Sequence, residues 1–543
     1  MAAPRAAGER RKKPWSKNVG VTPAGGVWDA IVIGSGMGGM TTAALLAQLG
    51  QQVLVLEQHY VPGGFTHMFK RPGYSWDVGV HAVGEVTERS LTGRLLAKLT
   101  GGSLRWASLG PVYDEFEFPD GFHIDFPDSP AQFRENLLAA APREARAIDE
   151  YLRLVREVAA GMKRYYLARV APRAVAPVID FALARPAQRY LELGTRDVIE
   201  SLTQDPRLRT LMAAQWGYYG SVPSRSSFAI QALVVRHFMH GGYYPVGGAR
   251  RIAETLLETV AAAGGWTRVA TDVAEIVIER GRAAGVRLVG GELLRARRVI
   301  SAAGVRSTVE RLLPAELREA PWARAVRELR PASAHVCLYL GFKGDIRRAG
   351  AGAANQWFYR TWSTEADGWD VGAAGPRGEA PVLYCSFPSL KDPEHDPGPE
   401  QRHTGEVVTF APWETFAPWR EQQWKKRGAE YETLKARLSE SLLEQFFRHR
   451  PAQRPLLDYA ELSTPVSTDN FCRPVAGSIY GLEPTPQRFR NPWLRPRSPV
   501  PGLYFSGSDV ASVGVVGAMM GGVLAAAAAE PIGTIRTIRA LRG

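Results

Sequence analysis

Three glycines and one acid near the N-terminus have a spacing that suits the binding of phosphate and sugar groups. Gly34, Gly36 and Gly39 form a G-x-G-x-x-G motif, and Glu57 follows at the distance expected of a ribose-binding carboxylate. The first glycine permits a tight turn, the second lets the backbone approach a pyrophosphate, and the third lets a helix pack closely on a strand. These residues therefore predict a dinucleotide site.

The residues around these glycines predict a strand, a helix and a second strand. Ala30–Ile33 is a short β-branched run, Gly38–Leu49 has a helical pattern with small residues, and Gln52–Leu56 is a second strand that leads to Glu57. The N-terminus of the helix would direct free N–H groups and the positive end of its dipole at the phosphates. A complete unit of this kind favours a dinucleotide site over glycines that only pack a turn.

Further stretches suggest contacts with the rest of such a cofactor. Val61–Phe65 contains a double glycine, which suits close contact between the backbone and a bulky second ring system. Gly502–Asp509 and Gly514–Ala518 have the pattern of a strand, a turn with an acid, and the start of a helix. Trp266–Ile278 and Val286–Ser301 alternate like strands. No second G-x-G-x-x-G occurs in a strand–helix context, so we expect no separate NAD(P) domain.

Together these stretches resemble the FAD-binding signatures of the carotenoid desaturase, carotenoid isomerase and retinol saturase group. The resemblance is closest to the retinol saturase (all-trans-retinol 13,14-reductase) family and extends over Asp29–Ala529. Stretches outside the FAD motifs that carry it include Asp77–His81, Met239–Gly248, Lys391-Asp392-Pro393 and Tyr480-Gly481.

The resemblance implies an α/β fold, with a Rossmann-type FAD-binding domain and a discontinuous α+β substrate domain, as in amine oxidases and phytoene desaturases. FAD is expected to bind noncovalently, with Val273 on its adenine side. The FAD-binding domain is expected at 28–95, 241–320 and 491–543, and the substrate domain at 96–240 and 321–490, after a basic flexible tail at 1–27. The residues expected at FAD are Gly34, Ser35, Gly36, Met37, Gly38, Gly39, Glu57, Gln58, Gly63, Gly64, Phe65, Thr66, Val273, Gly507, Asp509, Val516 and Gly517.

The resemblance also implies an apolar polyene substrate, a retinoid or a carotenoid, and saturation of one of its double bonds. A flavin carries out the hydride chemistry, so the protein must supply orientation and a proton. His81 is the first candidate for the proton donor and Tyr480 the second, while a core histidine with a backbone hydrogen bond remains the alternative for His81. His67 is expected to brace the flavin loop, Val61–Phe65, and Asp77 to cap or orient. No metal site is expected.

Several other functions remain open at this stage. Desaturation and cis–trans isomerisation use the same flavin site, and a polyene-binding protein without turnover is the alternative of another class. Phe65 and Thr66 stand where the family is expected to have small sulfur-containing residues, so the identity of the polyene and the electron donor stay open. Amine oxidases often attach flavin through a cysteine near the C-terminal motif, but Cys472 lies well upstream of it. The basic charge matches no nucleic-acid module, so no nucleic acid is expected.

The charge pattern favours peripheral contact with a membrane. The net charge is +13, and 161–191 interleaves basic and apolar residues in a way that suits an interfacial helix pair at a tunnel mouth. An ordinary amphipathic helix is the alternative. The uncharged runs Ala30–Gly50 and Val510–Ala529 are interpreted as cofactor-binding elements rather than spans, and no secretory signal precedes them. We therefore expect a cytoplasmic protein in contact with the inner face of the cell membrane. The aromatic residues expected to line the tunnel are Trp216, Tyr218, Tyr219, Phe238, Tyr243 and Tyr244.

Overall fold

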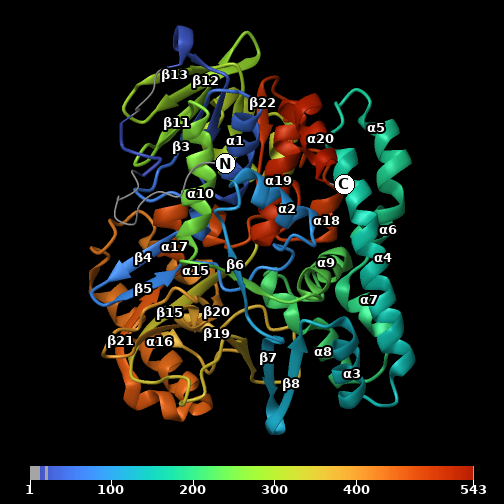
Figure 1. Ribbon diagram of the computed structural model, residues 1–543, viewed down its shortest axis with the longest axis vertical. Helices are drawn as coiled ribbons and strands as arrows, with labels where there is room; N and C mark the ends of the chain where they lie inside the picture. Colours follow the sequence, from blue (N-terminus) through green and yellow to red (C-terminus); the bar gives the residue numbers. More distant parts are fainter. Residues whose placement is uncertain (1–12, 19–22, 542–543) are drawn as a thin grey trace.

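The computed structural model describes residues 13–18 and 23–541, which form two sheet-based regions and a layer of helices (Figure 1). A five-stranded parallel sheet lies in the upper half of the view. Its strands come from parts of the chain that are far apart in sequence, because β14 lies between the N-terminal strand β2 and the C-terminal strand β22. In spatial order the strands are β10 (Trp266–Arg268), β3 (Val53–Leu56), β2 (Ala30–Ile33), β14 (Val299–Ser301) and β22 (Leu503–Phe505).

Two different layers cover this sheet. Alternate strand residues such as Ala30 and Val32 pack on one face against the helices α1 (Met37–Gln48), α10 (Arg250–Ala262) and α19 (Gly514–Ala529). The intervening strand residues pack on the other face, against a second, four-stranded sheet. The alternation follows from the pleat, which turns successive side chains to opposite faces. The four strands are β1 (Val27–Trp28), β13 (Leu293–Ala296), β12 (Arg282–Leu288) and β11 (Val273–Glu279).

A seven-stranded sheet occupies the lower half of the view. Helix α16 (Gly428–His449) packs on one face, through leucines spaced along one side of the helix. The other face meets the hairpin of β4 (Met68–Arg71) and β5 (Tyr74–Asp77), together with a cluster of aromatic residues. In spatial order the strands are β21 (Leu457–Ser463), β15 (Ala334–Lys343), β20 (Arg402–Ala411), β19 (Val382–Ser386), β16 (Asn355–Tyr359), β7 (Val112–Phe118) and β8 (Phe122–Pro127).

A helical layer runs along the right side of Figure 1 and shares a hydrophobic core with strands of the seven-stranded sheet. Its longest member, α4, is amphipathic and buries Ile148, Tyr151 and Val155 against α9 and its neighbours. The helices are α3 (Pro130–Ala140), α4 (Ala145–Arg169), α5 (Ala176–Ile179), α6 (Arg185–Glu192), α7 (Thr195–Leu202), α8 (Pro206–Ala213) and α9 (Phe228–Phe238). Parallel α/β and mixed α+β regions coexist, so the fold class predicted from the sequence is confirmed.

The uncharged C-terminal run forms α19, which packs closely on α1. A Cβ atom at Gly521 would lie 2.0 Å from the Gly507 carbonyl oxygen, and one at Gly522 would lie 2.4 Å from the Gly38 carbonyl oxygen. Only glycine permits this approach, because no side chain fits between the two backbones. Among the described residues, none of the helices has the length and apolar character required to cross a membrane.

Part of the predicted tail contacts the sheet. The Ser16 backbone N–H donates to the Thr267 carbonyl at 3.2 Å, and the Val269 N–H donates to Ser16 at 2.9 Å. The segment 13–18 therefore extends the β10 edge, while residues 1–12 and 19–22 of the tail lie outside the described residues.

Candidate active site

The first turn of the βαβ unit has the shape that phosphate binding requires. Gly34 adopts a positive φ of 94° as the chain leaves β2, and Gly36 is the N-terminal cap of α1. A Cβ atom at Gly39 would lie 2.1 Å from the Gly34 carbonyl oxygen, so the third glycine is required by packing within the motif. Met37 and Gly38 begin the buried helix.

The second glycine faces open space instead. A Cβ atom at Gly36 would have no atom within 4 Å, whereas Cβ atoms at Gly38 and Gly64 would lie 2.5 Å from Gly507 Cα and 2.9 Å from Gly36 Cα. The structure thus brings the N-terminal glycines, the flavin loop and the C-terminal turn together around the start of α1. The cradle in front of Gly36 and the free N–H groups of the helix fit a dinucleotide pyrophosphate.

Glu57 organises the walls of this cradle. One carboxyl oxygen, Oε2, accepts from the Ser35 N–H at 2.9 Å and from the Ser35 hydroxyl at 2.6 Å. The other oxygen, Oε1, accepts from the His59 N–H at 2.8 Å. Gly63 in turn donates its N–H to the Ser35 hydroxyl oxygen at 3.0 Å, which ties the flavin loop to the same carboxylate. Carboxyl oxygens have further lone pairs, so a ribose contact stays available.

The predicted adenine side lies beyond Glu57. The Thr271 N–H donates to the Glu57 carbonyl at 2.8 Å, so the start of β11 at Val273 approaches the end of β3. Gln58 donates its amide to the Phe471 carbonyl at 3.1 Å, which places the end of α17 (Pro465–Cys472) beside the same loop.

Asp509 joins three segments of the chain at the C-terminal turn. Its two carboxyl oxygens accept from the Val305 N–H at 2.8 Å and the Leu482 N–H at 2.9 Å. Val516 is buried at the start of α19, and a Cβ atom at Gly517 would lie 2.2 Å from the Ser512 carbonyl oxygen. Asp509 therefore fixes the approach of the segment that carries Tyr480.

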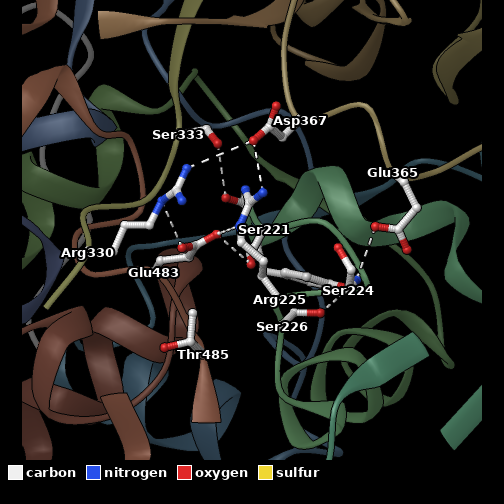
Figure 2. A network of polar contacts seen from close by, with 12 residues as sticks. Ser221, Ser224, Arg225, Ser226, Arg330, Ser333, Glu365, Asp367, Glu483 and Thr485 are labelled. Atoms are coloured by element: carbon white, nitrogen blue, oxygen red, sulfur yellow. Dashed lines mark hydrogen bonds and ion pairs between the residues drawn. The ribbon is translucent and has the colours of Figure 1, made fainter. Parts of the chain in front are cut away.

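A network of ion pairs, shown in Figure 2, also holds the segment that carries Tyr480. The buried Glu483 carboxylate contacts Arg225 Nε at 2.8 Å and Arg330 Nε at 3.2 Å, and the Ser221 hydroxyl donates to it at 2.8 Å. Asp367 contacts Arg225 Nη1 at 2.9 Å on the outer side. Since Glu483 follows Leu482 directly, the network and Asp509 together fix the strand-like piece after Tyr480.

The flavin loop is braced from within. The Thr66 hydroxyl donates to the Gly63 carbonyl at 2.8 Å, and His67 Nδ1 lies 2.5 Å from the Gly64 carbonyl oxygen. Burial lowers the pKa of His67 to about 4, so the ring is neutral and donates from Nδ1. This arrangement leaves Phe65 free to face the interior.

Phe65 faces a narrow cavity of about 90 Å³ that both predicted catalytic residues line. His81 and Tyr480 come from opposite ends of the sequence, and the Tyr480 ring lies close to Gly220, where a Cβ atom would be 2.7 Å from Cδ2 of the ring. A cavity this small holds only part of a long ligand. The lining residues are Phe65, Val78, Gly79, His81, Gly217, Tyr218, His335, Trp357, Val382, Tyr384, Val408, Thr409, Phe410, Ile479 and Tyr480.

The predicted aromatic lining is correct only in part. Tyr218 lines the cavity, but the Tyr219 hydroxyl donates to Gln231, and Trp216 packs behind the wall on Phe410. Tyr244 donates its hydroxyl to Asp77 instead of facing the cavity. The aromatic lining that the sequence did not reveal comes from strands of the seven-stranded sheet, namely Trp357, Tyr384 and Phe410.

A buried group of charged side chains lies directly behind His81. Glu406 on β20 has 1% exposure, and its Oε2 lies 2.9 Å from His81 Nδ1. The Lys391 amine donates to the His81 carbonyl at 2.8 Å, to the Ser386 hydroxyl at 2.7 Å and to the Asn355 side-chain oxygen. Asp77 accepts from the Tyr244 hydroxyl and from the Ala249 N–H at 3.1 Å, so it caps the start of α10.

Burial dominates the electrostatics of this group. It raises the pKa of Asp77 to about 7, helped by repulsion from Glu406, and it raises the pKa of Glu406 well above its usual range. It lowers the pKa of Lys391 to about 7, against the attraction of Glu406. Burial, followed by repulsion from Lys391, lowers the pKa of His81 to about 3, so His81 is neutral.

One feature of the sequence points to this group, although it lies outside the predicted site residues. Glu406 is the only charged residue between His403 and Ala411, in a strand that is otherwise apolar or small. An isolated acid in such a strand indicates a buried functional group. Lys391 stood in a stretch that resembles the retinol saturase family, but its partners lie far away in sequence. Within the part of the chain that the structure describes, no cluster of His, Cys, Asp or Glu is arranged to hold a metal ion.

Comparison with known proteins identifies the family of the chain and supports its fold. The family of flavin containing amine oxidoreductases matches residues 37–529. The chain is 32% identical to an all-trans-retinol 13,14-reductase of Danio rerio, over 91% of this chain and 84% of that protein. It is 30% identical to the protein of the same description from Homo sapiens, over 96% of this chain and 88% of that protein.

Other proteins are similar at lower identity or over a shorter part of the chain. A neurosporene-forming phytoene desaturase of Cereibacter sphaeroides is 29% identical over 60% of this chain and 62% of that protein. A Danio rerio protein described as an inactive all-trans-retinol 13,14-reductase is 28% identical over 92% of this chain and 85% of that protein. The solved structure of a cyclohexylamine oxidase from Brevibacterium oxydans shares the fold, with a TM-score of 0.59, 16% identity and coverage of 94% of this chain and 99% of that one. The chain therefore belongs to the flavin-containing amine oxidoreductase family and, within it, to the group of the all-trans-retinol 13,14-reductases.

Proposed function

We propose that the flavin cofactor is FAD and that it is bound noncovalently. The cradle before Gly36 and the position of Glu57 suit the pyrophosphate and ribose of a dinucleotide. Cys337 and Cys385 are buried in strands of the seven-stranded sheet, and Cys472 lies beside the Glu57 loop, on the predicted adenine side. Burial raises the pKa of the Cys472 thiol to about 12, which leaves it a poor nucleophile.

We propose further that the protein saturates one carbon–carbon double bond of a retinoid or carotenoid. The observation that carries this proposal is the small aromatic cavity beside the flavin loop. His81, Tyr480 and Phe65 all line this cavity. The bound flavin supplies a hydride. The chain orients the polyene between flat rings, excludes water from the reacting carbons and supplies the proton.

His81 is the proposed proton donor. Its ring lines the cavity and is neutral, because burial lowers its pKa to about 3. A neutral imidazole can donate from one nitrogen while it accepts at the other. Tyr480 is the second candidate, and burial raises the pKa of its hydroxyl, so that this group stays protonated.

The test is anaerobic incubation of chemically reduced holoprotein with all-trans-retinol and a panel of carotenoids, followed by chromatography and mass spectrometry. A product that is two mass units heavier with a shortened chromophore supports saturation. Gain of conjugation by oxidised protein identifies a desaturase, and unchanged mass with altered retention identifies an isomerase. Binding of a polyene with no product from either redox state identifies a binding protein.

We also propose that 161–193 docks the protein on an anionic membrane surface. Large apolar side chains are exposed along this stretch, with Val178 74% and Phe181 66% accessible. Lys163, Arg164 and Arg185 are exposed on the same stretch, and the Arg185 guanidinium lies 4.8 Å from the Phe181 ring. Arg169, in contrast, is buried and donates to the Asn491 and Leu494 carbonyls at 3.0 and 2.9 Å. Basic and apolar groups side by side suit the boundary between lipid headgroups and acyl chains.

A further inference from the structure

Glu406 is an unusual buried acid. Both of its carboxyl oxygens are inaccessible to solvent, and neither accepts a well-aligned hydrogen bond from the described residues. The nearby acids differ in this respect. Asp77 accepts from Tyr244 and Ala249, and Asp114 accepts from the Tyr218 hydroxyl at 2.6 Å and from the Asn355 amide at 2.9 Å. Of the three acids, Glu406 is therefore the one whose anion is stabilised least.

The balance of charge in this buried region also indicates that Glu406 is the acid that is protonated. Asp77, Asp114 and Glu406 share the buried region with a single ammonium group, that of Lys391, which is linked to Asp114 through Asn355. Full ionisation would bury uncompensated negative charge, which is strongly unfavourable. A proton must therefore reside on the acids, and Glu406, which accepts from no side chain and has only the Asp77 backbone N–H near it, retains that proton.

The position of Glu406 connects this proton to the cavity. Its Oε2 lies 2.9 Å from Nδ1 of His81, whose ring lines the cavity wall. That buried nitrogen has no other partner among the described residues. A protonated Glu406 satisfies it by donating an O–H, and the imidazole then carries its own proton on Nε2.

We propose that Glu406 holds the proton that His81 delivers to the polyene, so that the two residues form a proton relay into the cavity. This inference rests on the proposed saturation reaction. A reduced flavin bound at the dinucleotide site would supply the hydride for one carbon of the double bond. The neighbouring carbon takes the Nε2 proton, Nδ1 takes the Glu406 proton, and Glu406 is left as a carboxylate. The positive charge of the Lys391 ammonium group stabilises that anion until solvent returns a proton.

Glu406 holds the proton of this relay, and Asp77 and Lys391, whose pKa values burial brings to about 7, change charge in the neutral range beside it. Burial raises the pKa of the thiol of Cys337 and of the hydroxyls of Tyr244, Tyr339 and Tyr384, which keeps them neutral. The titratable or charged groups that face Glu406 are Asp77, His81, Tyr244, Cys337, Tyr339, Tyr384 and Lys391.

Glu406→Gln tests the relay, because the amide keeps the size and can donate a hydrogen bond to His81 but cannot release a proton. In infrared spectra of the oxidised holoprotein, we expect a neutral carboxylic acid band that is sensitive to deuterium and absent from Glu406→Gln. With reduced holoprotein and all-trans-retinol, we expect kcat to fall about 10²-fold with little change in KM, as for loss of a general acid. The part of the alkaline limb of the wild-type pH–rate profile that comes from ionisation of Glu406 should disappear, whereas any part set by Lys391 should remain. Glu414→Gln, an exposed acid further along the same segment, is the matched control.

The results separate this inference from the proposed function. If wild-type protein saturates a polyene and Glu406→Gln does so at the same rate with the same pH profile, the relay is refuted. Loss of the band from a variant other than Glu406→Gln also refutes it. If wild-type protein saturates no polyene, the proposed function fails, and the relay fails with it even where the band assigns a proton to Glu406. If Glu406→Gln does not fold, Glu406→Asp replaces it, and a shifted band with a shifted alkaline limb is then the expected result.

Discussion

Ser35 donates both its backbone N–H and its hydroxyl to the same carboxyl oxygen of Glu57, at 2.9 and 2.6 Å. The residue between the first two glycines of the motif is thereby tied to the end of the second strand. Glu57 therefore has two roles, since it shapes the phosphate-binding turn in addition to any contact with ribose. Its substitution should affect the loop as well as the cofactor.

Glu57→Arg is expected to abolish FAD retention, whereas Glu57→Gln should only weaken it. The amide oxygen of glutamine can still accept from Ser35, but arginine has no acceptor and is too large for a site with 6% exposure. The ratio of flavin to protein absorbance after gel filtration measures the effect. Glu316→Arg, at an exposed acid on α12 (Ala315–Arg318), should retain FAD as the parent does. Full retention by Glu57→Arg would show that the carboxylate is dispensable.

Alanine substitutions at the second and third glycines should separate cofactor binding from stability. Gly36→Ala places its methyl group in open space, so the apoprotein should unfold at the wild-type temperature while its affinity for FAD falls at least tenfold. Gly39→Ala places a methyl group 2.1 Å from the Gly34 carbonyl oxygen and should destabilise the apoprotein by about 1–3 kcal/mol. Thermal unfolding without flavin and fluorescence titration with FAD provide the two measurements. Equal stability of both variants would contradict the packing argument.

Much of the cofactor side of the fold could be predicted because its signals are local. The strand, the glycines, the helix and Glu57 all lie within 30–57, and the structure places them as β2, α1 and β3. The small residues of Val510–Ala529 predicted a helix whose backbone lies close to neighbouring segments. Gly521 and Gly522 make these contacts, with the backbones of Gly507 and Gly38. Such features depend on backbone conformation and packing distance, which individual residue types reveal directly.

The interior of the substrate side could not be predicted in the same way. Glu406, Lys391 and His81 come together from β20, α14 (Pro388–Lys391) and the segment after β5, which are distant in sequence. No periodicity links residues on separate strands of a sheet, so strand order alone decides these contacts. The same reason explains Tyr244, whose aromatic type indicated a cavity wall but whose hydroxyl binds Asp77.

The network around Glu483 in Figure 2 should stabilise the segment that carries Tyr480. Glu483→Gln removes a carboxylate that contacts Arg225 and Arg330, and we expect it to lower the free energy of unfolding by about 1–3 kcal/mol. A double-mutant cycle with Arg225→Gln, followed by chemical denaturation, measures the coupling between the two side chains. Additive effects of the two substitutions would show that the contact contributes nothing. Glu444→Gln, at an exposed ion pair with Arg454, is the control and should change stability little.

The buried charges should give the stability a characteristic dependence on pH. The pKa of Asp77 is raised from 3.8 to about 7 in the native state, so the native state binds this proton more tightly and stability falls as pH rises through that window. The pKa of Lys391 is lowered from 10.5 to about 7, so its contribution to stability rises with pH between these values. The thermal unfolding midpoint should therefore be measured across pH. Asp77→Asn should lack the fall in the midpoint between pH 3.8 and about 7, and Lys391→Met should lack the rise between about 7 and 10.5. Asp128→Asn, at an exposed acid, should follow the wild-type curve; parallel curves for all the variants would refute the assignment.

Aspartate substitutions at Val178 and Phe181 should detach the protein from anionic vesicles. Insertion of a valine or phenylalanine side chain into an apolar phase is worth about 1.5–3 kcal/mol, so each substitution should weaken binding at least tenfold in a vesicle pelleting assay. Val289→Asp, at a similarly exposed valine between β12 and β13, is the matched control and should bind as the parent does.

Charge reversal at Lys163 or Arg185 should weaken binding at low salt and have little effect at high salt, because ionic strength screens only the electrostatic part. Arg169 is unsuitable for this test, since its buried guanidinium supports the loop at Asn491 and Leu494 and its loss would disturb the fold. If Val178→Asp and Phe181→Asp pellet like Val289→Asp, the exposed apolar residues of 161–193 do not contact lipid, and the substrate enters from another surface.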